Sequence, residues 1–286
     1  MSIDLHTHTT ASDGTCSPTE LVKLASEVGL EAIAVTDHDT LSGLDEAQAA
    51  GRMFGVEVIP GCELSLELED GIGWLHMVAL WVPQDAKALN DAFEWVIEGR
   101  KNRNHEIVEK LRQQGISITY EAVAARAEGT IGRPHFAQEL VSLGVVSDVK
   151  EAFRVWIGDY GRAYVPKRKL KPKQALDILN EIGATSILAH PFALNMKPQD
   201  VDELLGKLKA MGLDGMEVYY SEHSDVEVKR YKELAEKHDL LISGGSDFHG
   251  TNKPHIALGK GRGKLHVPSE LLEKMKARRR EMGLPV

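Results

Sequence analysis

The sequence predicts an α/β protein with a parallel sheet, open or closed, and a helical insertion within it. Short apolar runs alternate with amphipathic helical patterns at both ends of the chain, and this alternation is typical of parallel strands joined by helices. Between the strand expected around His76 and the strand that ends at His190, only helical patterns occur. A chain of 286 residues is long enough to bury a substantial core without cross-links.

The first helices have clear sequence signals. Ser17 and Glu20 form a capping box, and Pro18 occupies the first helical position, so a helix is expected to begin there. Gly29 ends this helix, and Gly55 ends a second helix that is expected over residues 41–54. Strands are expected at residues 3–6, 31–36, 56–60, 75–82, 184–189, 215–219 and 240–243.

The long gap between the fourth and fifth strands predicts a helical insertion at residues 98–168. The α/β domain is then assembled from residues 1–97 and 169–286, with a helix at its C-terminal end. The exit of the insertion is rich in basic side chains, a pattern that a solvated surface loop also produces. One long polar helix is expected over residues 87–114, and three short helices are expected over 119–127, 134–143 and 147–154.

The composition excludes several classes of protein. Acidic residues outnumber lysine and arginine by 43 to 34, and the resulting net charge of -9 argues against a chain-wide surface for long duplex nucleic acid. No apolar run approaches the length of a membrane span, and the N-terminus has no secretory signal, so no membrane association is expected. The two cysteines favour a reducing, cytoplasmic location. The sequence indicates no particular oligomeric state.

Twelve histidines are present, and several of them lie with acidic residues at the expected ends of strands. His6 and His8 are two residues apart on a strand, so both side chains lie on one face and can reach one point. The carboxyl ends of parallel strands form the edge where α/β proteins place their chemistry. The candidate ligands that follow this pattern are His6, His8, Asp13, His38, Glu63, His76, His190, Asp247 and His249.

Each of these residues has an ordinary structural interpretation when it is considered alone. A single strand histidine such as His76 is commonly a satisfied core residue, and a single acidic residue after a strand commonly caps a helix. Together, so many buried ionisable groups would be costly unless cations satisfied them. Imidazoles and carboxylates without thiolates suit zinc, manganese or iron(II), and nine ligands point to two or three ions. The sequence therefore predicts a metal site with several ions.

Five segments of the chain resemble the motifs of a known family. HTHTTASDG, TDHDTLSG, PGCELS, ILAHP and GGSDFHG resemble the signatures of the PHP (polymerase and histidinol phosphatase) superfamily of metal-dependent phosphoesterases. The resemblance covers nearly the whole chain. GRPHFA and the helical insertion resemble the subgroup that acts on nucleoside 3′,5′-bisphosphates, nucleoside monophosphates or the 5′ ends of short RNA. The resemblance implies a distorted (β/α)7 barrel, the PHP fold, with three divalent metal ions of manganese, zinc or iron.

The resemblance also implies how the nine ligands are shared among the ions. The first ion would be held by His6, His8, Glu63 and Asp247. Glu63 would bridge to a second ion, which is also held by His76 and His190. The third ion would be held by Asp13, His38 and His249.

Phosphoester hydrolysis is the chemistry that such a site suits. Clustered dications neutralise phosphate charge and lower the pKa of a bound water towards about 7, which provides a hydroxide nucleophile at neutral pH. Asp37, and with less support Asp39, is a candidate to hold an imidazole in the required tautomer. For Asp39, a turn or a helix cap is an equally good interpretation.

Four further residues are candidates to bind the substrate: Arg133, His135, Lys167 and His223. Arginine presents a planar fork that matches phosphate oxygens, and a helix N-terminus beside Arg133 and His135 would add free N–H groups. Lys167 lies in the basic exit of the insertion, and His223 follows a strand. The alternative for Arg133 is a capping loop with a surface salt bridge.

These observations predict a metal-dependent phosphoesterase for nucleotides such as adenosine 3′,5′-bisphosphate and AMP, or for the 5′ ends of short oligoribonucleotides. Two other functions are compatible with the motifs. One is a histidinol-phosphate phosphatase, although such a small substrate needs no helical insertion. The other is a non-catalytic metal-binding module of a replication or repair assembly, although degenerate modules lose ligands and all nine are present here.

Overall fold

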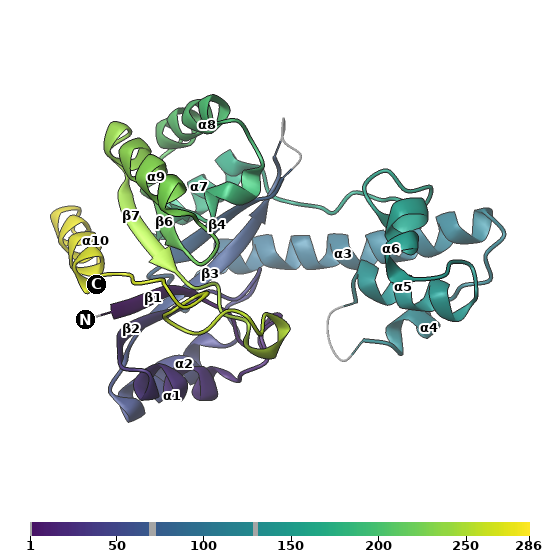
Figure 1. The fold of residues 1–286 in the computed structure, drawn as a ribbon, viewed down its shortest axis with the longest axis horizontal. Helices are drawn as coiled ribbons and strands as arrows, with labels where there is room; N and C mark the ends of the chain where they lie inside the picture. Colours follow the sequence, from purple (N-terminus) through teal and green to yellow (C-terminus); the bar gives the residue numbers. More distant parts are fainter. Residues whose placement is uncertain (1, 69–72, 128–130) are drawn as a thin grey trace. The chain divides into compact units, whose positions relative to one another are not determined.

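The computed structural model describes residues 2–68, 73–127 and 131–286, and the chain divides into two compact units. One unit consists of Met1–Phe93 and Leu170–Val286, and the other consists of Glu94–Lys169 (Figure 1). Residues 98–168, where an insertion is expected from the sequence, lie within the second unit. Each unit has an apolar core of its own.

The first unit is built on a sheet of seven strands that follow one another in chain order. The edge strands meet, because His8 N donates to Phe248 O at 2.9 Å and Asp247 N donates to His6 O at 2.8 Å. This nearly closed sheet with helices around it confirms the predicted barrel. The strands are β1 (Ser2–Thr7), β2 (Leu30–Val35), β3 (Glu57–Leu66), β4 (Leu75–Leu80), β5 (Thr185–Leu188), β6 (Gly215–Tyr220) and β7 (Leu241–Gly245).

One strand runs against the others, and this corrects the expectation of a parallel sheet. β4 is antiparallel to both β3 and β5, whereas the other neighbouring strands pair in parallel. The cause is the short connection over residues 67–74, because a parallel crossover needs a dozen or more residues. The reversal brings the start of β4, with His76, to the edge where β3 and the preceding parallel strands end.

Apolar side chains from five consecutive strands meet inside the curved sheet. Ile3, Ala32, Ile59, Val78 and Ile187 come from β1 to β5, and all of them are buried. α10 (Ser269–Glu281) adds two side chains to this cluster and packs against β1 and β7. The core fixes the strands and therefore the backbone positions from which the candidate ligands project.

Helices cover the outside of the sheet. α1 (Pro18–Glu27) begins with the predicted capping box, in which Glu20 N donates to Ser17 Oγ and Ser17 N donates to the Glu20 carboxylate. α2 (Leu44–Phe54) ends at Gly55, whose φ of 72° is left-handed. The later part of the unit contains α7 (Pro172–Glu181), α8 (Pro198–Ala210), α9 (Asp225–Lys237) and the short helices η2 (Pro191–Leu194) and η3 (Gly250–Asn252).

The second unit is helical, as the sequence predicts. α3 (Lys87–Gln113) is the long polar helix, and its last part belongs to this unit. Phe136 belongs to the apolar core of this unit together with residues of α3 such as Ile107 and Leu111, and all three are fully buried. The remaining elements are α4 (Tyr120–Ala124), α5 (Arg133–Ser142), α6 (Val149–Ala152) and the π-helical turn η1 (Phe153–Ile157).

Among the described residues, no helix combines the length and the apolar character that crossing a membrane requires.

Candidate metal centre

The nine predicted ligands lie together at one edge of the barrel. Within this set, every residue has a nitrogen or oxygen atom within 3.9 Å of another member. β1, β3 and β4 contribute residues from within the strands, whereas the others follow the ends of β1, β2, β5 and β7. The ligands in strands are His6, Glu63 and His76, and those in the connections are His8, Asp13, His38, His190, Asp247 and His249.

Glu63 is the centre of the cluster. Its carboxylate is almost fully buried, and its two oxygens face different imidazoles. Oε1 lies 2.9 Å from Nδ1 of His76 and 3.0 Å from Nε2 of His190. Oε2 lies 3.3 Å from Nε2 of His6, 3.3 Å from Nε2 of His8 and 3.1 Å from Nδ1 of His38. A carboxylate with this environment is suited to bridge two ions.

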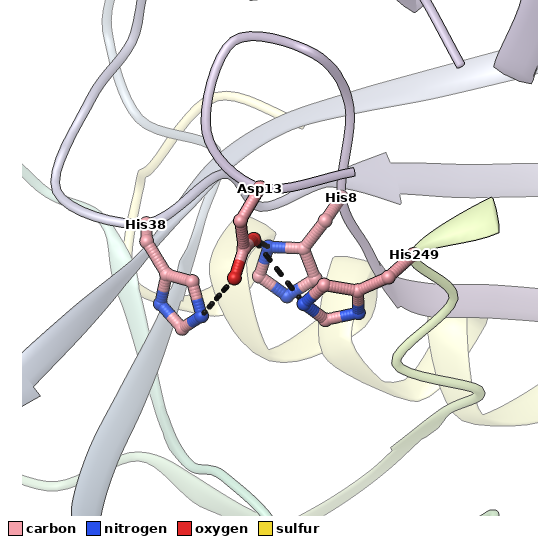
Figure 2. Close-up of side chains that lie close together, drawn as sticks. All are labelled: His8, Asp13, His38 and His249. Atoms are coloured by element: carbon pink, nitrogen blue, oxygen red, sulfur yellow. Dashed lines mark ion pairs between the residues drawn. The ribbon is translucent and has the colours of Figure 1, made fainter. Parts of the chain in front are cut away.

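Asp13 is the centre of a second group, which contains His8, His38 and His249 (Figure 2). Its carboxylate lies 3.2 Å from Nε2 of His249, 3.7 Å from Nδ1 of His8 and 3.9 Å from Nε2 of His38. One donor atom from each of the four residues lies within 4.8 Å of the others. Two further groups meet the same criterion: His6 with His8 and Asp247, and His38 with Glu63 and His76.

Buried nitrogen atoms in the cluster test whether metal ions fit it. Among the described residues, Nε2 of His6, both ring nitrogens of His8, Nδ1 of His38 and Nδ1 of His190 are buried without a hydrogen-bond partner. Such atoms are costly in a folded protein unless something satisfies them. Ligand atoms that surround one ion at about 2.1 Å lie about 3–3.5 Å apart, which matches the spacing around Glu63. The donor set therefore fits divalent metal ions.

The cluster perturbs the pKa values of its members in opposite directions. Burial raises the pKa of the Glu63 carboxyl, but the surrounding imidazoles of His38, His6 and His76 outweigh burial and hold that pKa well below its ordinary value. Burial lowers the pKa of His38 to about 3. Burial also opposes protonation of His8, but Asp247 and Glu63 prevail and raise the pKa of His8 to about 9. Without metal ions, nearby carboxylates favour the protonated form of an imidazole such as that of His8. Divalent cations would take the place of these protons.

Two of the candidate ligands have a strained backbone. The φ angles of Asp247 and His190 are 58° and 26°, in a region that residues with side chains seldom adopt. Such strain costs on the order of 1–3 kcal/mol per residue and concentrates at functional sites. Here it falls just after β7 and β5, where the chain turns away from the sheet.

Several supporting residues were missed by sequence reasoning. Glu217 in β6 is buried, its Oε1 lies 3.2 Å from Nδ1 of His6, and its Oε2 accepts from His190 N at 2.7 Å. Asp247 Oδ2 accepts from Tyr220 Oη at 2.7 Å and from Lys253 Nζ at 2.6 Å. The signal available in the sequence was a glutamate inside the apolar run GMEVYY, because a buried carboxylate needs partners.

Asp37 has a different role from the one expected, because its hydrogen bonds are not to an imidazole. Its carboxylate accepts from Thr9 N at 2.8 Å, from Thr9 Oγ1 at 2.7 Å and from Ser12 Oγ at 2.6 Å. Asp37 therefore fixes the turn that carries Asp13. Asp39 accepts from Ser65 N at 3.2 Å and links two neighbouring segments in the same way.

A cavity of about 460 Å³ opens onto the cluster. Its volume lies within the usual range of small-molecule sites, which is about 300–1,000 Å³. Seven of the candidate ligands line it, and apart from Ala193 the rest of its lining is polar or aromatic: Trp74, Phe192, Tyr220, Glu222, Asn252 and Lys253.

Three of the predicted substrate-binding residues belong to the second unit. Arg133 is the first residue of α5, where it forms the surface salt bridge considered above, with Asp159 at 2.8 Å. His135 Nδ1 accepts from Gly132 N at 3.0 Å and so caps the same helix. Lys167 lies in the segment that leaves the unit, between η1 and α7.

The second unit also contains a buried arginine that the sequence did not single out. Arg103 is only 7% exposed, and its Nε has no hydrogen-bond partner among the described residues. Burial, together with the nearby charges of Arg133 and Arg100, lowers the pKa of Arg103 to about 10. Three guanidinium groups in one region favour the binding of an anion.

His223, the fourth predicted substrate contact, lies in the first unit after β6. Its Nδ1 donates to Val218 O at 2.8 Å, and its ring packs against Phe192 and Tyr231. It is not one of the residues that line the described cavity. Its position is behind the aromatic part of that cavity.

The fold and the site define a barrel protein with a candidate centre for several divalent ions at the ends of its strands. The PHP domain family model matches residues 4–250, and the chain belongs to this family. A 5′-3′ exoribonuclease from Haemophilus influenzae is 37% identical over 246 residues, which cover 86% of this chain and 89% of the relative. The Chromobacterium violaceum 3′,5′-nucleoside bisphosphate phosphatase is 31% identical over 250 residues, which cover 87% of each chain.

A solved structure from Bifidobacterium adolescentis supports the fold assignment. That protein, described as a candidate metal-dependent phosphoesterase, superposes with a TM-score of 0.76 and 32% sequence identity. The match covers 96% of each chain, so it includes both units.

Proposed function

We propose that the protein is a metal-dependent phosphoesterase that hydrolyses phosphate monoesters of nucleotides, such as adenosine 3′,5′-bisphosphate and AMP, or the 5′ ends of short oligoribonucleotides. One observation carries the proposal: nine candidate metal-ligand side chains share a cluster on which a cavity of nucleotide size opens. Relatives named for exoribonuclease and nucleoside bisphosphate phosphatase activities support the substrate class. We infer a cytoplasmic location, because both cysteines are free.

We propose that the cluster holds three ions of manganese, zinc or iron. The first would be held by His6, His8, Glu63 and Asp247, the second by Glu63, His76 and His190, and the third by Asp13, His38 and His249. When bound, such ions neutralise phosphate charge and make a nucleophile available from water at neutral pH.

The residues of the chain have distinct tasks in this reaction. Glu217 accepts from the backbone of His190 and contacts the imidazole of His6, so it fixes the orientation of two ligands. Tyr220 and Lys253 hold one oxygen of Asp247, which leaves the other oxygen directed towards His8 and His6. Asn252 and Lys253 at the cavity wall supply N–H donors to a phosphate group.

We propose that the helical insertion binds a second phosphate of the substrate through Arg133, with His135 and Lys167 as further contacts. The unpartnered guanidinium nitrogen of Arg103 and the nearby Arg100 support an anion site in that unit. We propose that His223 affects substrate binding indirectly, through the Phe192 ring that it contacts at the cavity wall.

A phosphate-release screen tests this proposal. The protein is loaded with manganese, zinc or iron and incubated with adenosine 3′,5′-bisphosphate, AMP, di- to pentanucleotides that carry a 5′ phosphate, and histidinol phosphate. We expect release from the nucleotides and not from histidinol phosphate, with Glu63→Gln inactive. If all nucleotides are inert with every metal, the proposal fails. Turnover of histidinol phosphate alone favours the amino-alcohol phosphatase. A purified protein with less than one transition metal per chain, and with no activity after reconstitution with metal, favours the non-catalytic module.

A further inference from the structure

One wall of the cavity is aromatic, and the metal cluster does not account for it. Trp74 and Phe192 line the cavity together with the candidate ligands. Trp74 is 64% exposed, the largest exposure among the tryptophans of the chain, all of which are described. Exposed aromatic surface beside a polar site indicates a surface that a ligand covers.

The backbone around Trp74 fixes this residue beside the loop that carries Phe192. Trp74 N donates to Ala193 O at 2.8 Å. The preceding Gly73 packs so closely on the same loop that a Cβ atom there would lie 2.1 Å from Ala193 O, so only glycine fits. The indole therefore starts from a defined position although its side chain is open to solvent.

Phe192 is held in place by other rings. Its ring stacks on Tyr220, with centroids 5.5 Å apart and planes inclined by 30°, and His223 meets it edge-on at 5.8 Å. Tyr220 is in turn fixed by its hydrogen bond to Asp247. The Phe192 ring remains partly exposed, so one part of it is backed by protein and another part is available to a ligand.

Both aromatic residues lie two positions from a candidate metal ligand. Trp74 lies immediately before β4, which begins at Leu75, and two residues before His76. Phe192 follows His190 after β5. A substrate with its phosphate at the cluster would therefore have its next group beside these rings. In a nucleotide, that group is a sugar that carries a flat base.

We propose that Trp74 and Phe192 form a stacking surface for the nucleobase and thereby select nucleotides over sugar phosphates without a base. This inference rests on the proposed function, because it assigns a binding surface to the base of the same nucleotide whose phosphate lies at the cluster. Every base has a π face, so the surface discriminates the presence of a base and not its identity. Base–aromatic stacking changes binding about 5- to 150-fold for each base.

Kinetics on AMP and ribose 5-phosphate test the stacking surface, because the two substrates differ in the base alone. We expect Trp74→Ala to lower kcat/KM for AMP by about 5- to 150-fold, mainly through KM, and to leave ribose 5-phosphate unchanged. Trp74→Phe should restore most of the loss. Trp95→Ala removes an exposed tryptophan of α3 and should alter neither substrate. Equal losses for both substrates, or no loss, would overturn the inference.

Adenosine binding separates this inference from the proposed function, because adenosine has a base and no phosphate. Calorimetric titration should show adenosine binding to the wild-type protein and binding weaker by about 5- to 150-fold in Trp74→Ala. If the protein hydrolyses no nucleotide but this difference is found, the proposed function fails and the stacking surface stands. If Trp74→Ala binds adenosine as tightly as the wild type does, or if the wild type does not bind it, the stacking surface is refuted whatever the activity.

Discussion

Substitution of Glu217 by glutamine should weaken metal binding although Glu217 is not one of the nine candidate ligands. Its carboxylate is 2% exposed and contacts two ligand residues, at 3.2 Å from His6 Nδ1 and 2.7 Å from His190 N. Both of these neighbours are satisfied by an oxygen that accepts a hydrogen bond. Glutamine has the same shape but offers one accepting oxygen and one NH2 group.

The single glutamine oxygen would accept from His190 N at the Oε2 position, which lies 3.4 Å from His6 Nδ1, whereas the nearer position, 3.2 Å from His6 Nδ1, would become an NH2 group. If its oxygen faces His190 N, its NH2 group faces His6 Nδ1 and favours the tautomer with the proton on Nε2. That proton would occupy the nitrogen that lies 3.3 Å from Glu63 Oε2. Loss of such an orienting partner lowers metal affinity by about 10- to 100-fold, which corresponds to about 1.4–2.7 kcal/mol.

Competition between the metal-free protein and a chromophoric chelator for zinc measures this loss. Glu139→Gln is a matched control, because Glu139 is also a buried carboxylate, bound by Arg126 Nε at 2.5 Å in the second unit. The control should lower the melting temperature and leave zinc affinity unchanged. Equal zinc affinity of Glu217→Gln and the wild type would refute the reasoning, as would an equal loss in Glu139→Gln.

Three more predictions follow from the same geometry. Glu63→Gln should abolish phosphate release and lower metal content, whereas Arg133→Ala should raise KM for adenosine 3′,5′-bisphosphate and leave metal content unchanged. Kinetics and elemental analysis of both variants measure these effects. Equal loss of metal in the two variants would contradict the assigned roles. Removal of ions by a chelator should lower the melting temperature, because ions at 100 times their dissociation constant add about 2.7 kcal/mol to stability, and an unchanged melting curve would argue against the site. Phe136→Ala should lower the free energy of unfolding by about 3–5 kcal/mol, because the ring is fully buried in the core of the second unit. An unchanged midpoint in a denaturant titration would contradict this prediction.

Much of the fold could be predicted from local sequence signals. The capping box at Ser17 and the glycine at position 55 set helix ends that depend only on neighbouring residues, and the structure has both. The direction of β4 could not be obtained in the same way, because alternation of strands and helices says nothing about a hairpin. The length of the 67–74 connection was the available clue, since it is too short for a crossover.

The candidate site was predictable where its residues share a motif and unpredictable where they meet only in space. His6, His8 and Glu63 stand in recognisable segments, and the structure brings them together. Glu217 contacts His6 across 211 residues of sequence, so no local pattern connects them. Asp37 was assigned to an imidazole because His38 is its neighbour in the chain, but the turn after β1 brings Thr9 and Ser12 to its carboxylate instead.

The order in which the chain is synthesised limits when the metal centre can form. His6 leaves the ribosome well before its partner Asp247, because 240 residues lie between them in the sequence. β1 and β7 meet at this point, so the complete ligand set exists only in a chain that has joined its first and last strands. A nascent chain would therefore bind ions incompletely, and full metal content would serve as a chemical measure of how many molecules have finished folding.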